Sequence, residues 1–234
     1  MTNSHSGRYA RRSTLGQLVS PIRNEQAIQS KQERLSMLDT TLSDQQLIDT
    51  FLLQILENEA KGVLQDLLAQ PTLAMQFLFF SEEATRKAIK HVVGIFDECY
   101  RAGQLKVAMS HENGCLYGYA LLFVHPDPNV PRYCHKIFVF PDFRGHGIGS
   151  QILNALIDDP RDTALLCGYD LVDFYENAGL EQKGAFVAPG KQQGFALTQG
   201  MYADLIVMGT PGASVAAGVF MLNDDDVKAL LTCA

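Results

Sequence analysis

Apolar residues recur at helical spacing in four parts of the chain. From Ser43 to Ala69, leucine, isoleucine and phenylalanine stand three or four positions apart, which predicts a long amphipathic helix with Lys61-Gly62 as a candidate interruption. Residues 82–101 carry a second apolar stripe behind acidic residues in the first turn, and predict another helix. A third helix is predicted after Gly149, and a fourth begins at Asn223, ahead of three aspartates. A short helix closed by Gly179 is predicted over Val172–Leu180.

Short apolar runs bounded by turn residues predict the strands. They are Leu73–Phe80, Gln104–Met109, Cys115–Val124, Cys134–Phe140, Thr163–Tyr169, Ala185–Ala188, Ala203–Met208 and Ser214–Leu222. The turn Glu112-Asn113-Gly114 predicts a hairpin between the second and third of these runs. Leu73–Phe80 is the ambiguous member, because a short apolar run does not by itself distinguish a strand from a buried helix.

Composition narrows the class of protein. The 234 residues are 47% hydrophobic, enough for one sizeable core. The five cysteines form no C-x-x-C pair, so we expect a reducing compartment and no metal site. No apolar run approaches the roughly 20 residues that a membrane span requires, and the N-terminus lacks the apolar core of a signal peptide. We therefore expect a cytoplasmic protein that does not bind membranes.

Charge is distributed unevenly along the chain. The chain has a net charge of −7. Residues 1–36 contribute +4, so the remaining residues contribute −11. Residues 1–40 are polar and nearly free of aromatic side chains, which predicts a flexible basic arm ahead of a helical extension at 41–70. The acidic body argues against nucleic acid and favours a cationic or amine-bearing substrate. Simple solubility explains the acidity equally well.

The stretch from Tyr133 to Asp158 combines a strand, a glycine-rich loop and a helix. The strand ends at Pro141, and Gly145, Gly147 and Gly149 follow at every second position. Such a loop leaves main-chain N–H groups bare at the positive end of a helix, which predicts a site for a phosphate or pyrophosphate. The spacing excludes a P-loop, which needs Gly-Lys-Ser/Thr, and the dinucleotide fingerprint G-x-G-x-x-G.

Two motifs resemble those of the GNAT superfamily of acetyl-CoA-dependent N-acetyltransferases. The run 144–149, Arg-Gly-His-Gly-Ile-Gly, is similar to the R/Q-x-x-G-x-G/A loop of that family. One strand later, Phe174-Tyr175-Glu176-Asn177-Ala178-Gly179-Leu180 looks like its F-Y-E-x-x-G-F segment. The resemblance covers residues 71–211, leaves 212–234 as a C-terminal strand and helix extension, and says nothing about either end.

The resemblance implies a fold and a cofactor. The fold is an α/β arrangement with a mixed, mostly antiparallel sheet of six or seven strands and helices on both faces, which would open at the glycine-loop strand. Acetyl-CoA would be the co-substrate, with its pantetheine along Ile137, Phe138 and Val139. The residues implied for its pyrophosphate are Arg144, Gly145, His146, Gly147, Ile148 and Gly149.

The resemblance also implies roles in catalysis. Tyr175 would protonate the departing thiolate, since the family commonly uses the tyrosine at this position as a general acid. His135 is the candidate base; it stands four residues before Val139, so we expect the two to share a face of the strand. Further candidates for the base are His125, Asp127 and Glu112.

This sequence departs from the family pattern at the second motif. Gly168 stands where many relatives have an asparagine that touches the cofactor, and Leu180 stands where phenylalanine is common. We predict an acyltransferase that moves acetyl to a small-molecule or protein amine by direct attack. The alternative is a catalytically silent CoA-binding regulatory or interaction module. A homodimer, and delivery to a partner by the arm and first helix, stay open.

Overall fold

The computed structural model describes residues 44–77, 79–112, 114–214 and 218–233. The predicted flexible arm and the predicted helix start at Ser43 lie outside these residues. The main helices are α2 (Asp44–Leu68), α3 (Pro71–Phe77), α4 (Glu82–Arg101), α5 (Ile148–Ile157), α6 (Val172–Asn177) and α7 (Asp224–Leu231). The strands are β1 (Leu105–Glu112), β2 (Cys115–Phe123), β3 (Arg132–Val139), β4 (Thr163–Cys167), β5 (Glu181–Ala185) and β6 (Ile206–Gly209).

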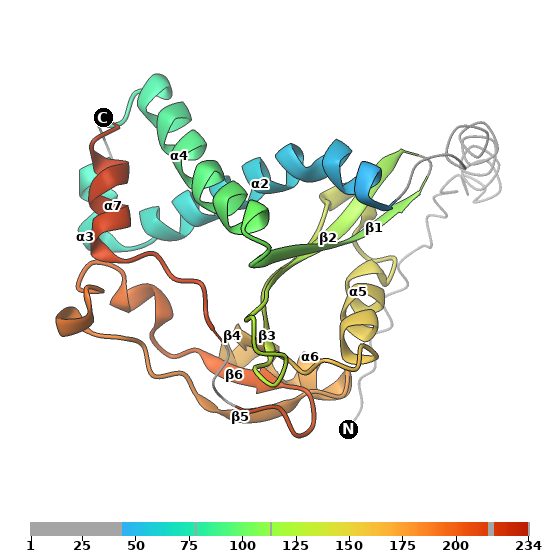
Figure 1. The fold of residues 1–234 in the computed structure, drawn as a ribbon. Coiled ribbons are helices and arrows are strands. Elements are labelled where there is room, and N and C mark those ends of the chain that lie inside the picture. Colours follow the sequence, from blue (N-terminus) through green and yellow to red (C-terminus); the bar gives the residue numbers. More distant parts are fainter. Residues whose placement is uncertain (1–43, 78, 113, 215–217, 234) are drawn as a thin grey trace, which may run out of the picture.

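One six-stranded sheet organises the molecule, in the order β1-β2-β3-β4-β6-β5 (Figure 1). Every neighbouring pair is antiparallel except β3 and β4, which run parallel. One apolar cluster joins the sheet to α2, α4 and α7, and a second joins the opposite face to α5 and α6. The predicted mixed, mostly antiparallel sheet with helices on both faces is confirmed. Among the described residues, no helix is both long and apolar enough to cross a membrane.

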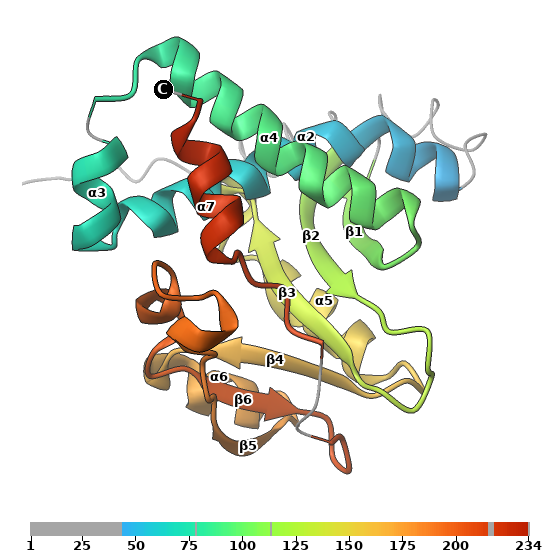
Figure 2. The same cartoon turned by 60° about the vertical axis from the view of Figure 1, so that its left-hand side comes forward.

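Strands β3 and β4 pair over only a short length and then separate. Their register runs from Arg132↔Thr163 to Cys134↔Leu165 and stops there, although β3 continues to Val139. Figure 2 shows the two strands diverging toward their C-terminal ends. The predicted opening of the sheet is therefore present, and it leaves the C-terminal half of β3 without a partner on one side.

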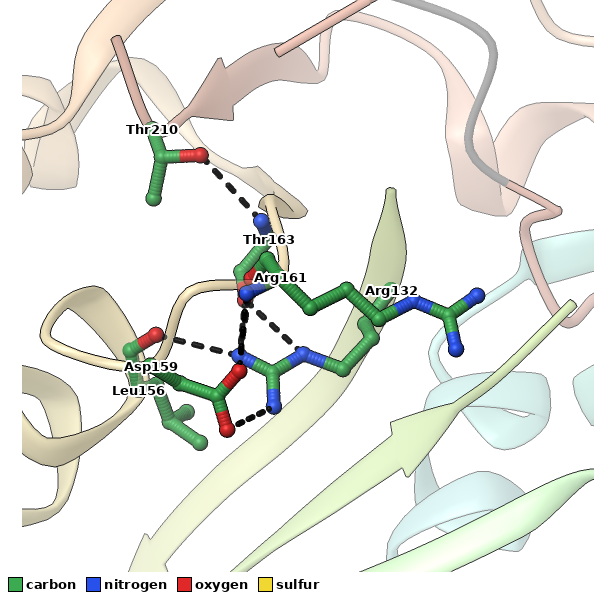
Figure 3. A network of polar contacts seen from close by, with 6 residues as sticks. All are labelled: Arg132, Leu156, Asp159, Arg161, Thr163 and Thr210. Carbon is green, nitrogen blue, oxygen red and sulfur yellow. Dashed lines mark hydrogen bonds and ion pairs between the residues drawn. The ribbon is translucent and has the colours of Figure 1, made fainter. Parts of the chain in front are cut away.

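Arg132 links β3 to its neighbours at the end where β3 and β4 are still paired (Figure 3). Its guanidinium is buried and donates to Thr163 Oγ1 at 2.8 and 3.2 Å and to the Leu156 carbonyl at 3.1 Å. Its Nη1 lies 2.9 Å from the carboxylate of Asp159. Thr163 N–H in turn donates to Thr210 Oγ1, which follows β6, at 3.2 Å. These bonds hold β3, β4 and the end of α5 together where the strands begin to part.

A β-bulge at His135 changes the face on which side chains of β3 point. Leu121 pairs with Lys136 and Leu122 pairs with Cys134, so His135 has no opposite residue in β2. Because of this extra residue, His135 and Lys136 both turn toward α2, and the alternation restarts after them. Val139 packs in the α5-side cluster, on the other face. The expectation that His135 shares a face with Val139 is therefore wrong.

The predicted strand Leu73–Phe80 is also wrong, because residues 71–77 form helix α3. Leu73 and Phe77 are buried four positions apart, whereas Met75 is 64% exposed, which is helical and not strand periodicity. Pro71 is the first residue of α3, where its missing N–H costs nothing. Helix α2 runs without a break through Gly62, so the candidate interruption there does not occur.

Toward the C-terminus two predicted strands shift in position and a third does not form in the described residues. The strand predicted at 185–188 lies instead at Glu181–Ala185, and the one predicted at 163–169 ends at Cys167. In the predicted strand Ser214–Leu222, the described residues 218–222 form no strand. The last helix begins after Asn223 as predicted, and the Asn223 side chain accepts hydrogen bonds from two amides of its first turn.

Candidate active site

The glycine loop follows β3 and leads directly into α5. Gly145 and Gly147 have φ of +78° and +74°, a left-handed conformation that side chains with a Cβ rarely adopt. The first hydrogen bond of α5 runs from Gln151 N–H to the Gly147 carbonyl at 3.0 Å. The amides of Ile148 and Gly149 precede this bond, at the positive end of the helix dipole. The loop therefore has the geometry of the predicted anion site.

A cavity of about 260 Å³ lies against this loop. It is lined by Val139, Phe143, Arg144, Gly145, Gly147, Ile148, Gly149, Ser150 and Phe174. The predicted residue His146 is not in the lining: its Nδ1 lies 2.9 Å from the Arg144 carbonyl, so the ring folds back on the loop. Phe143, Ser150 and Phe174 were not predicted. Ser150 belongs to the first turn of α5, and Phe174 precedes Tyr175. Their positions directly beside the two motifs could have indicated that they line the cavity.

Arg144 contributes a positive charge at the cavity. Its Nε donates to the Val139 carbonyl at 3.1 Å, and its guanidinium carbon lies 5.8 Å from the centroid of the Phe138 ring. These contacts fix the plane of an otherwise exposed side chain. In the part of the chain that the structure describes, the two terminal nitrogens make no hydrogen bond or ion pair, so they are available to an anion.

The open edge of β3 presents the main chain of two predicted residues. Phe140 N–H donates to the Tyr117 carbonyl of β2 at 3.0 Å. Because main-chain groups alternate along a strand, those of Ile137 and Val139 turn away from β2, toward the side that β4 has left. Phe138 stands opposite Tyr119 and turns its main chain toward β2. The structure thus brings Ile137 and Val139, but not the main chain of Phe138, to the open edge.

Tyr175 approaches the opening from α6. The ring packs against the α5-side cluster. Burial, together with the nearby Cys134 and Cys167 thiols, raises the pKa of the Tyr175 phenol to about 12. Its hydroxyl makes no hydrogen bond to any residue that the structure describes. The phenol is therefore protonated at neutral pH and has its proton available where β3 and β4 part.

His135 lies on the opposite face of the sheet, against α2 and α4. Its ring is surrounded by Phe96, Phe123, Tyr133 and Phe220, with centroids 5.4 to 5.9 Å away. Its Nε2 lies 3.4 Å from Oε1 of Glu59, a buried residue of α2. Sequence reasoning missed Glu59, because nothing in the local pattern distinguishes it from the other polar residues of that helix.

The three other candidate bases serve local structure. His125 Nδ1 accepts the Asp127 amide at 3.1 Å, and the Asp127 carboxylate accepts the Asn129 amide at 2.9 Å, within the loop that precedes β3. Glu112 accepts a hydrogen bond from the Tyr117 hydroxyl at 3.1 Å, at the hairpin of β1 and β2. Of the four candidates, only His135 lies on the strand that carries the open edge.

Comparison with known protein families agrees with this geometry. The model of the acetyltransferase (GNAT) family matches residues 72–179. Residues 72–179 are a GNAT acetyltransferase domain. The GNAT domain contains the glycine loop, His135 and Tyr175, and it leaves α2, β5 and β6 outside the matched region. The resemblance stated from the two motifs is thereby confirmed.

Several solved structures are similar to part of the chain, at low sequence identity. Escherichia coli ElaA is 17% identical over 45% of this chain and 68% of its own, with a TM-score of 0.34. A mutant of spermidine N-acetyltransferase SpeG from Vibrio cholerae is 15% identical over 52% and 74%, with a TM-score of 0.40. PaiA N-acetyltransferase from Thermoplasma acidophilum, in complex with coenzyme A, is 13% identical over 68% and 93%, with a TM-score of 0.39. No curated protein matches the chain.

Proposed function

We propose that this chain is an N-acetyltransferase that moves the acetyl group of acetyl-CoA to an amine by direct attack. The GNAT domain supports acyl transfer. The observation that carries the proposal is the continuity between the open edge of β3 and the glycine-loop cavity. The edge offers main-chain partners to an extended thioester arm, and the loop offers amides to the phosphates at the other end of that arm.

The residues at this site fit acetyl-CoA, which supplies the thioester. The left-handed glycines bring the loop amides together, and the terminal nitrogens of Arg144 supply positive charge for a pyrophosphate. Ile137 and Val139 offer main-chain groups to the amides of pantetheine, although Arg144 already occupies the Val139 carbonyl. The proposed cofactor-binding residues are Ile137, Val139, Arg144, Gly145, Gly147, Ile148 and Gly149. Phe138, whose main chain faces β2, and His146, whose ring folds back on the loop, are left out.

Tyr175 is the proposed general acid. As the amine nitrogen bonds to the carbonyl carbon, the carbon–sulfur bond breaks and the departing thiolate takes the phenol proton. A phenol with a pKa of about 12 is a poor acid toward a thiolate in water. Burial also raises the pKa of the neighbouring Cys134 thiol, so surroundings of this kind make a sulfur anion a stronger base than it is in water, which favours its protonation.

His135 is the proposed base for the attacking amine. It stands at the bulge, two residues before the main chain that Ile137 presents to the thioester arm. Its two ring nitrogens are buried and make no hydrogen bond among the described residues. The amine proton therefore reaches the imidazole through a bridging water or after the ring moves. Glu59, 3.4 Å from Nε2, stabilises the imidazolium that this step creates.

Calorimetry and a thiol-release assay test the proposal. We expect acetyl-CoA and free CoA to bind, and we expect free thiol to appear when acetyl-CoA is mixed with an acceptor from a panel of small amines and lysine peptides. Longer acyl-CoAs in the same titrations define the acyl chain that fits. The absence of binding to every CoA species would contradict the proposal.

A catalytically silent CoA-binding module is the second candidate. It is favoured by Gly168, which stands where many relatives have a cofactor-contacting asparagine. A Cβ at this position would meet only the exposed side chain of Asp170, at 2.6 Å, so the glycine is not required by the packing around it. The same two assays separate the candidates. Tight acetyl-CoA binding without thiol release across the whole amine panel would favour the silent module and contradict catalysis.

A further inference from the structure

Glu59 is a buried carboxylate without a short hydrogen bond to any described residue. The side chain is 2% exposed. Its Oε1 lies 3.4 Å from His135 Nε2 and 3.8 Å from Lys136 Nζ, and its Oε2 lies 3.4 Å from the Tyr119 hydroxyl. Charge-assisted hydrogen bonds to carboxylates are ordinarily about 2.7–2.9 Å long. A buried carboxylate with only long contacts has unused capacity to accept hydrogen bonds.

Burial raises the pKa of Glu59, but its contacts with His135, Lys136 and Tyr119 outweigh that effect and hold the pKa below its ordinary value. Glu59 is therefore an anion at neutral pH. Two further titratable groups interact with it. One is Asp66, two turns further along α2, whose pKa is raised by burial and by the charge of Glu59; the other is the buried Tyr133 of β3, whose pKa is raised mainly by burial. The site thus presents negative charge on the α2 side of the bulge.

Lys136 is the partly exposed partner of this buried carboxylate. Its side chain is 35% exposed, in contrast to Glu59. Its Nζ lies 3.5 Å from the position that a Cβ on Gly62 would occupy, so the missing side chain of α2 leaves room for the ammonium. The next residue is Ile137, which turns its main chain to the open edge. A primary ammonium on a flexible chain therefore lies beside α2, carried by the residue that precedes Ile137 in β3.

We propose that Glu59 receives the ammonium group of the acceptor, and that Lys136 occupies its place while no acceptor is bound. The inference rests on the proposed function, since the acceptor must meet the thioester at the β3 bulge. The chemical class that fits is a primary alkylamine, which is protonated in solution at neutral pH and matches the end of a lysine side chain. Acceptor recognition then comes from α2, outside the matched GNAT region.

Three variants distinguish this role from a purely structural contact between α2 and β3. Lys136→Met removes the competing ammonium and keeps the length of the side chain. Glu59→Gln removes the charge and keeps the shape. Glu57→Gln makes the same change at an exposed position of the same helix and serves as the control.

The probe is n-butylammonium, titrated by calorimetry with and without saturating CoA. We expect Lys136→Met to bind it roughly tenfold more tightly than the wild type, and Glu59→Gln roughly tenfold or more weakly, as expected for losing one member of a buried charge pair. Glu57→Gln should match the wild type. The affinity for CoA should be the same in all four proteins, so a protein that binds n-butylammonium but not CoA contradicts the proposed function and not this inference.

Equal affinity of the wild type, Lys136→Met and Glu59→Gln for n-butylammonium would overturn the inference. If Glu59→Gln does not fold, Lys136→Met decides alone. If the Glu59–Lys136 contact is purely structural, Lys136→Met lowers the midpoint of thermal unfolding without any gain in affinity for the probe. An acceptor site predicts the gain in affinity.

Discussion

The two halves of the candidate site are built in different ways. The proposed cofactor half uses the main chain: left-handed glycines, the amides at the start of α5 and the unpaired edge of β3. The proposed acceptor half uses side chains from distant parts of the sequence, with Glu59 and His135 brought together by the packing of α2 on β3. The first lies inside the matched GNAT region, and Glu59 of the second lies outside it.

This difference explains what each half tolerates. A main-chain site requires particular backbone angles, so it constrains residue type at a few adjacent positions and leaves a local motif. A side-chain site requires only that suitable groups meet in space, so the same chemistry is available from many positions. Cofactor binding can therefore stay constant within a family while acceptor recognition varies with the segments added around it.

Replacing Tyr175 with phenylalanine is expected to give the largest effect. Without the phenol proton, the thiolate must leave as an anion in a buried place, so we expect turnover to fall about 10²- to 10⁴-fold, the range found for general acids. Acetyl-CoA binding should change little, because the ring remains. The measurement is thiol release under saturating acetyl-CoA. Tyr169→Phe is the control, since that ring is 74% exposed; normal turnover in Tyr175→Phe would remove Tyr175 from the mechanism.

Arg132 joins β3 and β4 at the point where the two strands begin to separate, so its loss should lower the stability of the whole domain. Arg132→Met leaves Asp159 and the carbonyl of Leu156 without their partner, and we expect a loss of about 3–5 kcal/mol in the free energy of unfolding. Urea denaturation measures it. Arg101→Met removes an exposed pair with Asp97 and should cost less than about 1 kcal/mol. Equal losses in the two variants would show that the Arg132 network contributes no more to the free energy of unfolding than an exposed ion pair does.

Two glycines with nearly the same backbone angle allow the cofactor half to be tested separately from stability. Gly147 and Gly103 have φ of +74° and +73°, the first in the loop and the second after α4. Alanine at either position should cost about 1–2 kcal/mol of stability. Only Gly147→Ala should also weaken acetyl-CoA binding, by roughly tenfold, because the loop amides shift. Calorimetry decides, and equal affinities in the two variants would contradict the phosphate site.

The local geometry of the glycine loop could be predicted from the sequence better than the packing around His135, for the same physical reason. The glycine spacing and the order of strand, loop and helix are local, and the structure has them. The face of His135 was wrong because one extra residue in β3 shifts a period of two, and a bulge has no distinct composition. Strand β5, at the sheet edge, is polar and so escaped a search for apolar runs. Glu59 meets Tyr119 from 60 positions away, which no local pattern records.

The smallest expected effect, a change with pH, tests whether Glu59 is charged in the folded protein. Its folded pKa lies below the ordinary value of 4.5, so the folded state binds fewer protons than the unfolded state near that pH. Stability from this group is fully present above pH 4.5 and is lost as pH falls through the folded pKa. The unfolding free energy of the wild type, relative to Glu59→Gln, should therefore decrease between pH 5 and pH 3. Urea denaturation of both proteins at matched pH measures this difference. A difference that stays constant over the range would mean that the carboxylate is protonated or unpaired in the folded state, and Glu59 could not then hold an ammonium ion.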